Sequence, residues 1–204
     1  ISIKDVMELV DYYQQKEDSC LFAMALYYSG SAYRNLNNAP LAIKFFCQAL
    51  EKYEEIGDTE RAGAIHCQIG FLLLKQKLPD QAMAHFKQSY DCCKQLKDTT
   101  NLVYIIEKMA LVYEVKNDKD SCMALHRQAY DLAEQAHNNI LKGDVRLQSA
   151  SMLLKNKDYK EAEQILNENI CKTKYTDSCI HEHMLLCLYL GTKRYDKAES
   201  SALK

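Results

Sequence analysis

The chain has 204 residues, of which 26% are charged, and its formal charge at pH 7 is −2. Positive and negative side chains are interspersed, so no strong field of one sign favours a nucleic acid or an anionic membrane as partner. No apolar run approaches the roughly 20 residues that a membrane-spanning helix needs. Composition therefore predicts that this part of the chain contacts neither nucleic acid nor membrane.

Nine cysteines are present, an odd number, and no two of them have the C-x-x-C spacing. A disulfide framework or a paired-cysteine zinc site is therefore not expected. Free cysteines are typical of a reducing compartment such as the cytoplasm. No signal peptide is recognisable at Ile1. A periplasmic location stays open if a signal or lipoprotein segment has been removed.

Apolar residues at helical spacing predict a chain of helices from one end to the other. The first expected helix, 3–16, carries Val6 and Val10 and aligns with the second helix of a preceding unit. It would cover the otherwise exposed face of the first full repeat. Polar residues able to cap a helix, or Pro40 and Pro79 at a helix start, mark the turns that follow. The remaining expected helices are 20–36, 41–56, 59–76, 81–96, 100–116, 121–137, 140–156 and 159–169, then a connector at 171–176 and a last pair whose second helix starts at Tyr195.

Positions where two helices would touch recur every 40 residues, and such a period indicates a helical repeat array. Three kinds of position recur at this interval: the small residue of the first helix, the small residue of the second helix, and the large residue that follows the latter. These are Gly30, Gly70, Ala110 and Ala150; Ala42, Ala82, Cys122 and Ala162; and Phe46, Phe86, His126 and Leu166. Tyr33 and Tyr113 also hold packing positions, and the final step, to Ala198, is shorter.

This pattern resembles the tetratricopeptide repeat, whose usual period is about 34 residues. The 40-residue version is similar to the long-helix variety found in signalling scaffolds and in bacterial multi-repeat regulators. The resemblance implies an all-α, right-handed superhelical solenoid of antiparallel helix pairs. We expect a single array over 1–204, with a capping helix at 1–18, repeats at 19–58, 59–98, 99–138 and 139–174, and a partial repeat at 175–204.

In this family the first helices of successive repeats line a concave groove, where ligands lie. The resemblance therefore implies a groove surface of aromatic, amide and charged side chains. The candidate residues are Tyr27, Tyr28, Ser31, Arg34, Asn35, Gln68, Phe71, Lys75, Tyr104, Glu107, Lys108, Glu114 and Gln148. One subset of the family grips a C-terminal carboxylate through lysine and asparagine. The corresponding positions here supply one suitable residue, Lys108, so we do not expect that clamp.

Other reactive side chains do not form a recognisable centre. Cys179, His183 and Cys187 share one helical stripe, but about 12 Å separates the outer pair along a helix, so they do not converge on a metal. His66 and His126 fall at packing positions. No glycine loop for phosphate, nucleophile elbow or H-E-x-x-H motif occurs, and we expect neither an enzyme nor a bound cofactor.

The sequence thus predicts a scaffold that binds a protein or peptide segment in its groove. Because the chain starts without methionine, we expect it to be a piece of a longer regulatory protein of the bacterial kind, in which it senses or binds a partner. The alternative is a structural or oligomerisation spacer without a groove ligand, for which a homodimer would be the simplest form.

Overall fold

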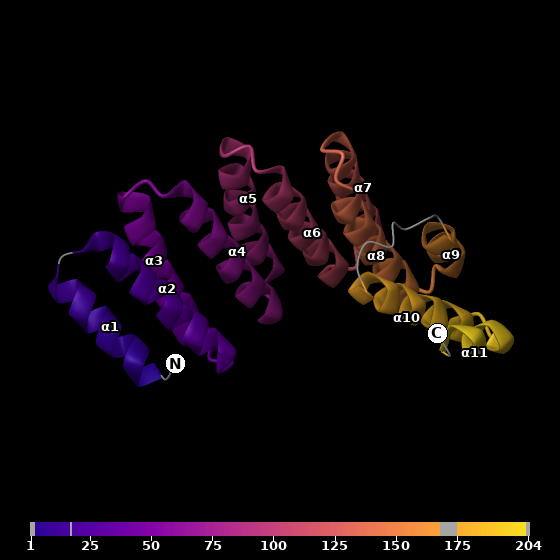
Figure 1. Cartoon of the computed structure of the whole chain (residues 1–204), viewed down its shortest axis with the longest axis horizontal. Coiled ribbons are helices and arrows are strands. Elements are labelled where there is room, and N and C mark those ends of the chain that lie inside the picture. The colour runs from indigo at the N-terminus through magenta and orange to yellow at the C-terminus, as the bar shows by residue number, and fades with distance from the viewer. Residues whose placement is uncertain (1–2, 17, 168–174, 203–204) are drawn as a thin grey trace. The chain divides into compact units, whose positions relative to one another are not determined.

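The computed structural model describes residues 3–16, 18–167 and 175–202, which form α-helices throughout and contain no strand (Figure 1). This confirms the predicted all-α class. The helices are α1 (Ile3–Gln15), α2 (Ser19–Asn35), α3 (Ala39–Glu55), α4 (Thr59–Lys75), α5 (Pro79–Gln95), α6 (Thr99–Val115), α7 (Lys119–Gln135), α8 (Asn139–Lys155), α9 (Tyr159–Asn167), α10 (Tyr175–Gly191) and α11 (Tyr195–Ala202). None of these described helices is long and apolar enough to cross a membrane.

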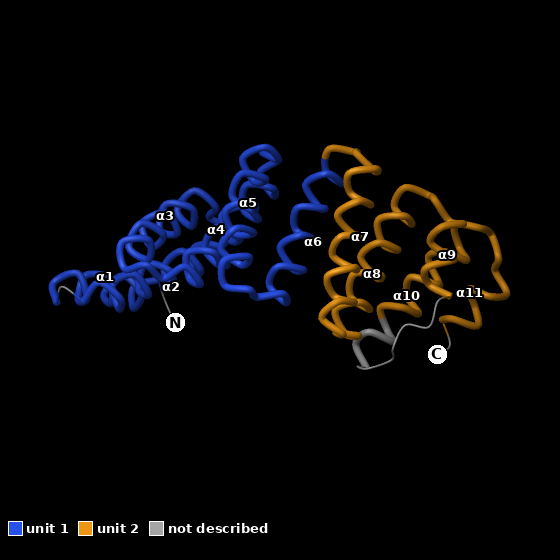
Figure 2. The backbone as a smooth tube through the Cα atoms, turned by 90° about the horizontal axis from the view of Figure 1, so that it is seen from above, with its two compact units in different colours: residues 1–115 blue, residues 116–204 orange. Residues whose placement is uncertain are grey.

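The chain divides into two compact units, residues 1–115 and 116–204 (Figure 2). Unit 1 contains α1 to α6, and each of these helices packs against the next. Unit 2 contains α7 to α11, where α8 packs against α7, α9 and α10, and α10 packs against α9 and α11. The boundary falls between α6 and α7, the two helices expected for the third repeat.

The turns between helices repeat every 20 residues, half the period seen in the sequence. A residue with positive φ follows each helix from α2 to α8: Asn37, Gly57, Lys77, Lys97, Asn117, His137 and Lys157. The residue after this one precedes the next helix, and at most of these positions its side-chain oxygen accepts a backbone N–H of the first turn, which would otherwise lack a partner. Such bonds are made by Asn38, Asp58, Asp98, Asp118 and Asn138, and by Asp18 ahead of α2. Leu78 makes none, and Pro79 starts α5 there.

The core of unit 1 depends on glycines that let an aromatic ring approach the neighbouring helix. A Cβ atom on Gly30 would lie 2.7 Å from the ring of Phe46, and one on Gly70 would lie 2.8 Å from the ring of Phe86. Both rings are fully buried. Tyr33 stacks on Phe45, with ring centroids 5.4 Å apart, which confirms its predicted packing role. The small-to-large pairing read from the sequence is therefore the contact that joins α2 to α3 and α4 to α5.

Unit 2 repeats this arrangement with smaller partners. Ala150 of α8 and Leu166 of α9 are both buried at the positions of the glycine and the phenylalanine. Further along, Arg194 donates two hydrogen bonds to the carboxylate of Glu163, at 2.6 and 3.0 Å, which joins the start of α11 to α9. The expected connector at 171–176 lies largely outside the described residues. The structure corrects its end, because α10 begins at Tyr175.

Candidate functional site

A pocket of about 490 Å³ in unit 1 is lined by the first helices of its repeats, α2, α4 and α6. It lies where the last turn of α2 faces α4 and α6. We call it the groove pocket. It is lined by Arg34, Asn35, Asn37, Cys67, Gln68, Phe71, Lys75, Tyr104 and Lys108. Seven of the predicted groove residues are therefore brought together here.

The polar side of the groove pocket is held by a hydrogen bond between repeats. The guanidinium of Arg34 donates through Nη1 to Oε1 of Gln68 on α4. Its other terminal nitrogen lies 3.4 Å from Oδ1 of Asn35. Because both partners are neutral amides, the positive charge of Arg34 is positioned without being neutralised.

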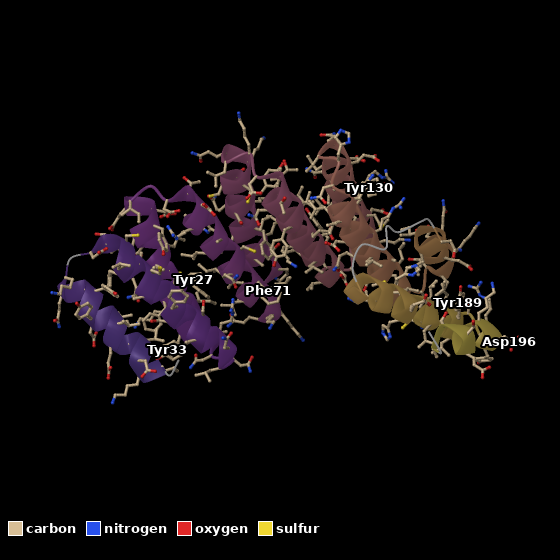
Figure 3. All side chains as sticks on the ribbon, viewed as in Figure 1. Tyr27, Tyr33, Phe71, Tyr130, Tyr189 and Asp196 are labelled. Atoms are coloured by element: carbon tan, nitrogen blue, oxygen red, sulfur yellow. The ribbon has the colours of Figure 1, made fainter. Side chains whose placement is uncertain are left out.

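The aromatic side of the groove pocket carries two more cations. The ammonium of Lys75 lies 4.9 Å from the ring centroid of Phe71, and that of Lys108 lies 4.3 Å from the ring centroid of Tyr104. Phe71 lies on α4, between α2 and α6, in Figure 3. None of the nine lining residues is acidic. The pocket thus combines three positive charges, three side-chain amides and two aromatic rings.

A second pocket of about 240 Å³ lies between α4, α5 and α6 and contains thiols. Cys67, Cys92 and Cys93 line it, together with Gln68 and Tyr104, which also belong to the groove pocket. Burial raises the pKa of the Cys67 thiol to about 11, although nearby Lys108 opposes the shift. Burial, with help from Asp98, raises the pKa of Cys93 to about 11. These thiols stay protonated at neutral pH, which makes them poor nucleophiles.

The other predicted groove residues do not line the groove pocket. Tyr27 is half-buried, with its ring centroid 5.7 Å from that of Phe46, so it packs against α3 (Figure 3). Tyr28 is 54% exposed beside it, and Ser31 is half-buried. Glu107 and Glu114 lie half-buried on α6. Gln148 is exposed on α8, in unit 2.

Two lining residues, Cys67 and Asn37, are not among the predicted candidates. Asn37 was missed because it belongs to the turn after α2 and not to a helix. Its φ of 57° places it in the left-handed region, where asparagine is favoured among non-glycine residues. An asparagine directly after the last helical turn was the available signal. The Asn37 side chain adds an amide to the lining of the pocket.

The histidine and cysteine stripe on α10 forms a single local contact. Nε2 of His183 lies 3.7 Å from Sγ of Cys187, one helical turn away. The third member, Cys179, has its side chain outside the described part of the structure. Among the described residues, no group of three histidine, cysteine, aspartate or glutamate side chains is arranged to hold a metal.

Helix pairs that bury a glycine or alanine against a large residue, with a pocket over the first helices of unit 1, define a helical-repeat scaffold of the tetratricopeptide type. The model of the family "Soluble NSF attachment protein, SNAP" matches residues 29–181 of the sequence. The chain belongs to this family. A search of curated proteins found no match.

Solved structures with the same fold support the repeat class at low sequence identity. BtubC (BKLC) from P. vanneervenii is 11% identical, with a TM-score of 0.77 over 98% of this chain and 86% of its own. A Rap protein complexed with Competence and Sporulation Factor is 15% identical, with a TM-score of 0.71 over 97% of this chain and 58% of its own. The Signal Transduction ATPase with Numerous Domains of Pyrococcus horikoshii, with a tetratricopeptide repeat sensor, is 14% identical. Its TM-score is 0.64 over 98% of this chain and 36% of its own. The predicted resemblance to tetratricopeptide-repeat proteins is confirmed, whereas the SNAP family was not foreseen.

Proposed function

We propose that the groove pocket binds an extended protein segment with acidic side chains, and that the chain is the interaction part of a larger regulatory protein. The observation that carries the proposal is the charge of the lining. Arg34, Lys75 and Lys108 surround one concave surface to which no carboxylate contributes. A ligand carboxylate would meet cations that neutral amides and aromatic rings already hold in place.

The uncharged part of the lining suits a peptide backbone. Asn35, Asn37 and Gln68 present amides that both donate and accept hydrogen bonds, as the main chain of an extended segment requires. Phe71 and Tyr104 offer flat apolar surface to a ligand side chain, and such aromatic anchors carry much of the energy at interfaces. Charge would then steer the segment towards the groove, and aromatic contact would hold it there.

The comparisons support a binding role without identifying the partner. A structurally similar Rap protein was solved with Competence and Sporulation Factor bound, and the similar repeats of the Pyrococcus horikoshii ATPase form a sensor. The SNAP family name itself denotes attachment to another protein. The regulatory part of the proposal rests on these likenesses, and the groove chemistry rests on the pocket.

Selection from a library of random displayed peptides tests the proposal without a known partner. We expect the enriched peptides to carry aspartate or glutamate. Their affinity, measured by fluorescence anisotropy, should fall at least about tenfold in Lys108→Ala and in Arg34→Ala, as loss of a charge-assisted contact implies. Lys87→Ala is the matched control, because Lys87 is exposed on α5 and does not line the pocket.

Further measurements distinguish a groove that binds a ligand from a structural spacer. Replacing the acidic residues of a selected peptide by asparagine or glutamine should weaken binding, and added salt should do the same. Neutral or basic selected peptides, or equal losses in Lys87→Ala and Lys108→Ala, would refute the acidic-segment proposal. Failure to select any peptide, together with a stable dimer in light scattering, would favour the structural spacer.

A further inference from the structure

The contact between α4 and α5 contains two histidines where another repeat has two apolar side chains. His66 is 9% exposed, and its Nδ1 lies 3.0 Å from Nδ1 of the half-buried His85. Forty residues earlier, Leu26 and Phe45 are both buried at these positions. The later equivalents are Ile106 and Leu125, then Arg146 and Ile165. The second repeat therefore has an ionisable pair that no other repeat of the chain has at these positions.

The surroundings of the pair give its charged form little support. On α3, Oε1 of Glu54 lies 3.9 Å from Nε2 of His66, but its side chain is 59% exposed, so water screens its charge. On α5, Cys92 is close enough to Glu54 for that carboxylate to help raise the pKa of the thiol. On the α6 side, Lys108 approaches Cys67, the neighbour of His66 along α4.

The short N–N distance requires that one ring donates and the other accepts, because both nitrogens cannot carry a proton in a hydrogen bond. A first added proton can leave the shared hydrogen bond in place, so the two rings titrate as a coupled pair. A second proton leaves two N–H groups facing each other 3.0 Å apart. Burial, and then the neighbouring His85, lower the pKa of His66 to about 4, and burial lowers the pKa of His85.

We infer that the His66–His85 pair is an acid-sensitive contact, which holds α4 against α5 at neutral pH and separates them when both rings are protonated. The folded pKa of His66 lies below its ordinary value of 6.5, so the unfolded chain binds protons first as pH falls. The contact is therefore complete above pH 6.5 and weakens as pH falls towards about 4. The inference needs no groove ligand and stands apart from the proposed function.

Hydrogen exchange of the wild-type chain tests the inference. Protection of the α4 and α5 amides is compared with that of α2 and α3 at pH 7.5 and at pH 4.5, so that intrinsic exchange rates cancel. Because the pKa of His66 falls from 6.5 to about 4 on folding, local opening of the contact can increase by up to about 100-fold between pH 7.5 and pH 4.5. We therefore expect the α4 and α5 amides to lose at least about tenfold more protection than those of α2 and α3. Equal changes in both helix pairs would overturn the inference.

The variant His66→Leu/His85→Phe installs the pair of the first repeat and should remove the relative pH effect. Persistence of the effect in this variant would also overturn the inference. A second measurement covers failure of the variant to fold, because it uses the unaltered chain. The ring signals of His66, followed by NMR, should titrate below about pH 5, whereas a midpoint near 6.5 would contradict the inference.

Discussion

Replacement of Gly70 by alanine tests whether the glycine exists to admit the Phe86 ring. The new Cβ would lie 2.8, 2.9 and 3.1 Å from three carbons of that ring, which is fully buried. Carbon atoms pack best at about 3.5–4.0 Å, so ring and helix must move apart by roughly 0.7 Å. Such overpacking costs about 1–3 kcal/mol, against about 1 kcal/mol gained from the higher helix propensity of alanine. We expect a net loss of about 1 kcal/mol in the free energy of unfolding.

The fourth repeat supplies the compensating partner. Ala150 is buried with Leu166 there, so Gly70→Ala/Phe86→Leu reproduces a pair that the chain already uses. Phe86→Leu alone should destabilise unit 1, because it leaves a void beside Gly70. The added methyl group fills part of that void in the double variant. The two changes should therefore couple favourably, by about 1 kcal/mol or more.

Urea unfolding followed by circular dichroism gives all four free energies of the cycle. Unchanged slopes of free energy against urea would show that the variants differ in stability and not in the surface exposed on unfolding. Two results would refute the reasoning. One is a Gly70→Ala variant stabilised by about 1 kcal/mol, the full propensity gain. The other is a coupling energy within about 0.5 kcal/mol of zero, the scatter expected for independent sites.

Two smaller predictions follow from the caps and the thiols. Leu78→Asp would give α5 the side-chain cap that Asp58 gives α4, and Leu78 is already 38% exposed, so unfolding should cost about 1 kcal/mol more in the same urea assay; a loss of stability would contradict this. Cys67 and Cys93 should be alkylated by iodoacetamide far more slowly than the exposed Cys20 at pH 8, because their raised pKa values of about 11 keep the thiolate scarce; equal rates in the folded chain would contradict burial as the cause.

The repeat architecture could be predicted because it depends on pairs of residues that the sequence displays directly. A glycine or alanine on one helix and a large residue on the next leave a 40-residue pattern, and Gly70 with Phe86 shows why the spacing is strict. The 20-residue period of the turns could not be predicted in the same way. Asparagine, lysine, histidine and glycine all adopt positive φ in these turns, so residue type does not reveal the period. Regular aspartate and asparagine caps were its only clear sequence mark.

Seven of the thirteen candidate groove residues line the groove pocket, but the contacts between them could not be predicted. A shift of 40 residues makes Arg34 equivalent to Leu74 and Gln68 equivalent to Tyr28. Such equivalence between repeats does not say which side chains touch. The guanidinium of Arg34 reaches Gln68, 34 residues away. The step fixes which backbone positions face the groove, whereas the length of each side chain decides which neighbour it meets. Gln148 shares the position of Gln68, yet it belongs to the other unit.

The chain departs from its repeat in two ways. Ala150 replaces a glycine by another small residue and remains buried, so it preserves the packing between α8 and α9. The His66–His85 pair departs differently, because it puts ionisable rings where Leu26 and Phe45 need only bury surface. Buried polar pairs add little stability compared with apolar residues of similar size. A polar pair at this position therefore gains little through packing, and its distinguishing property is its response to protons.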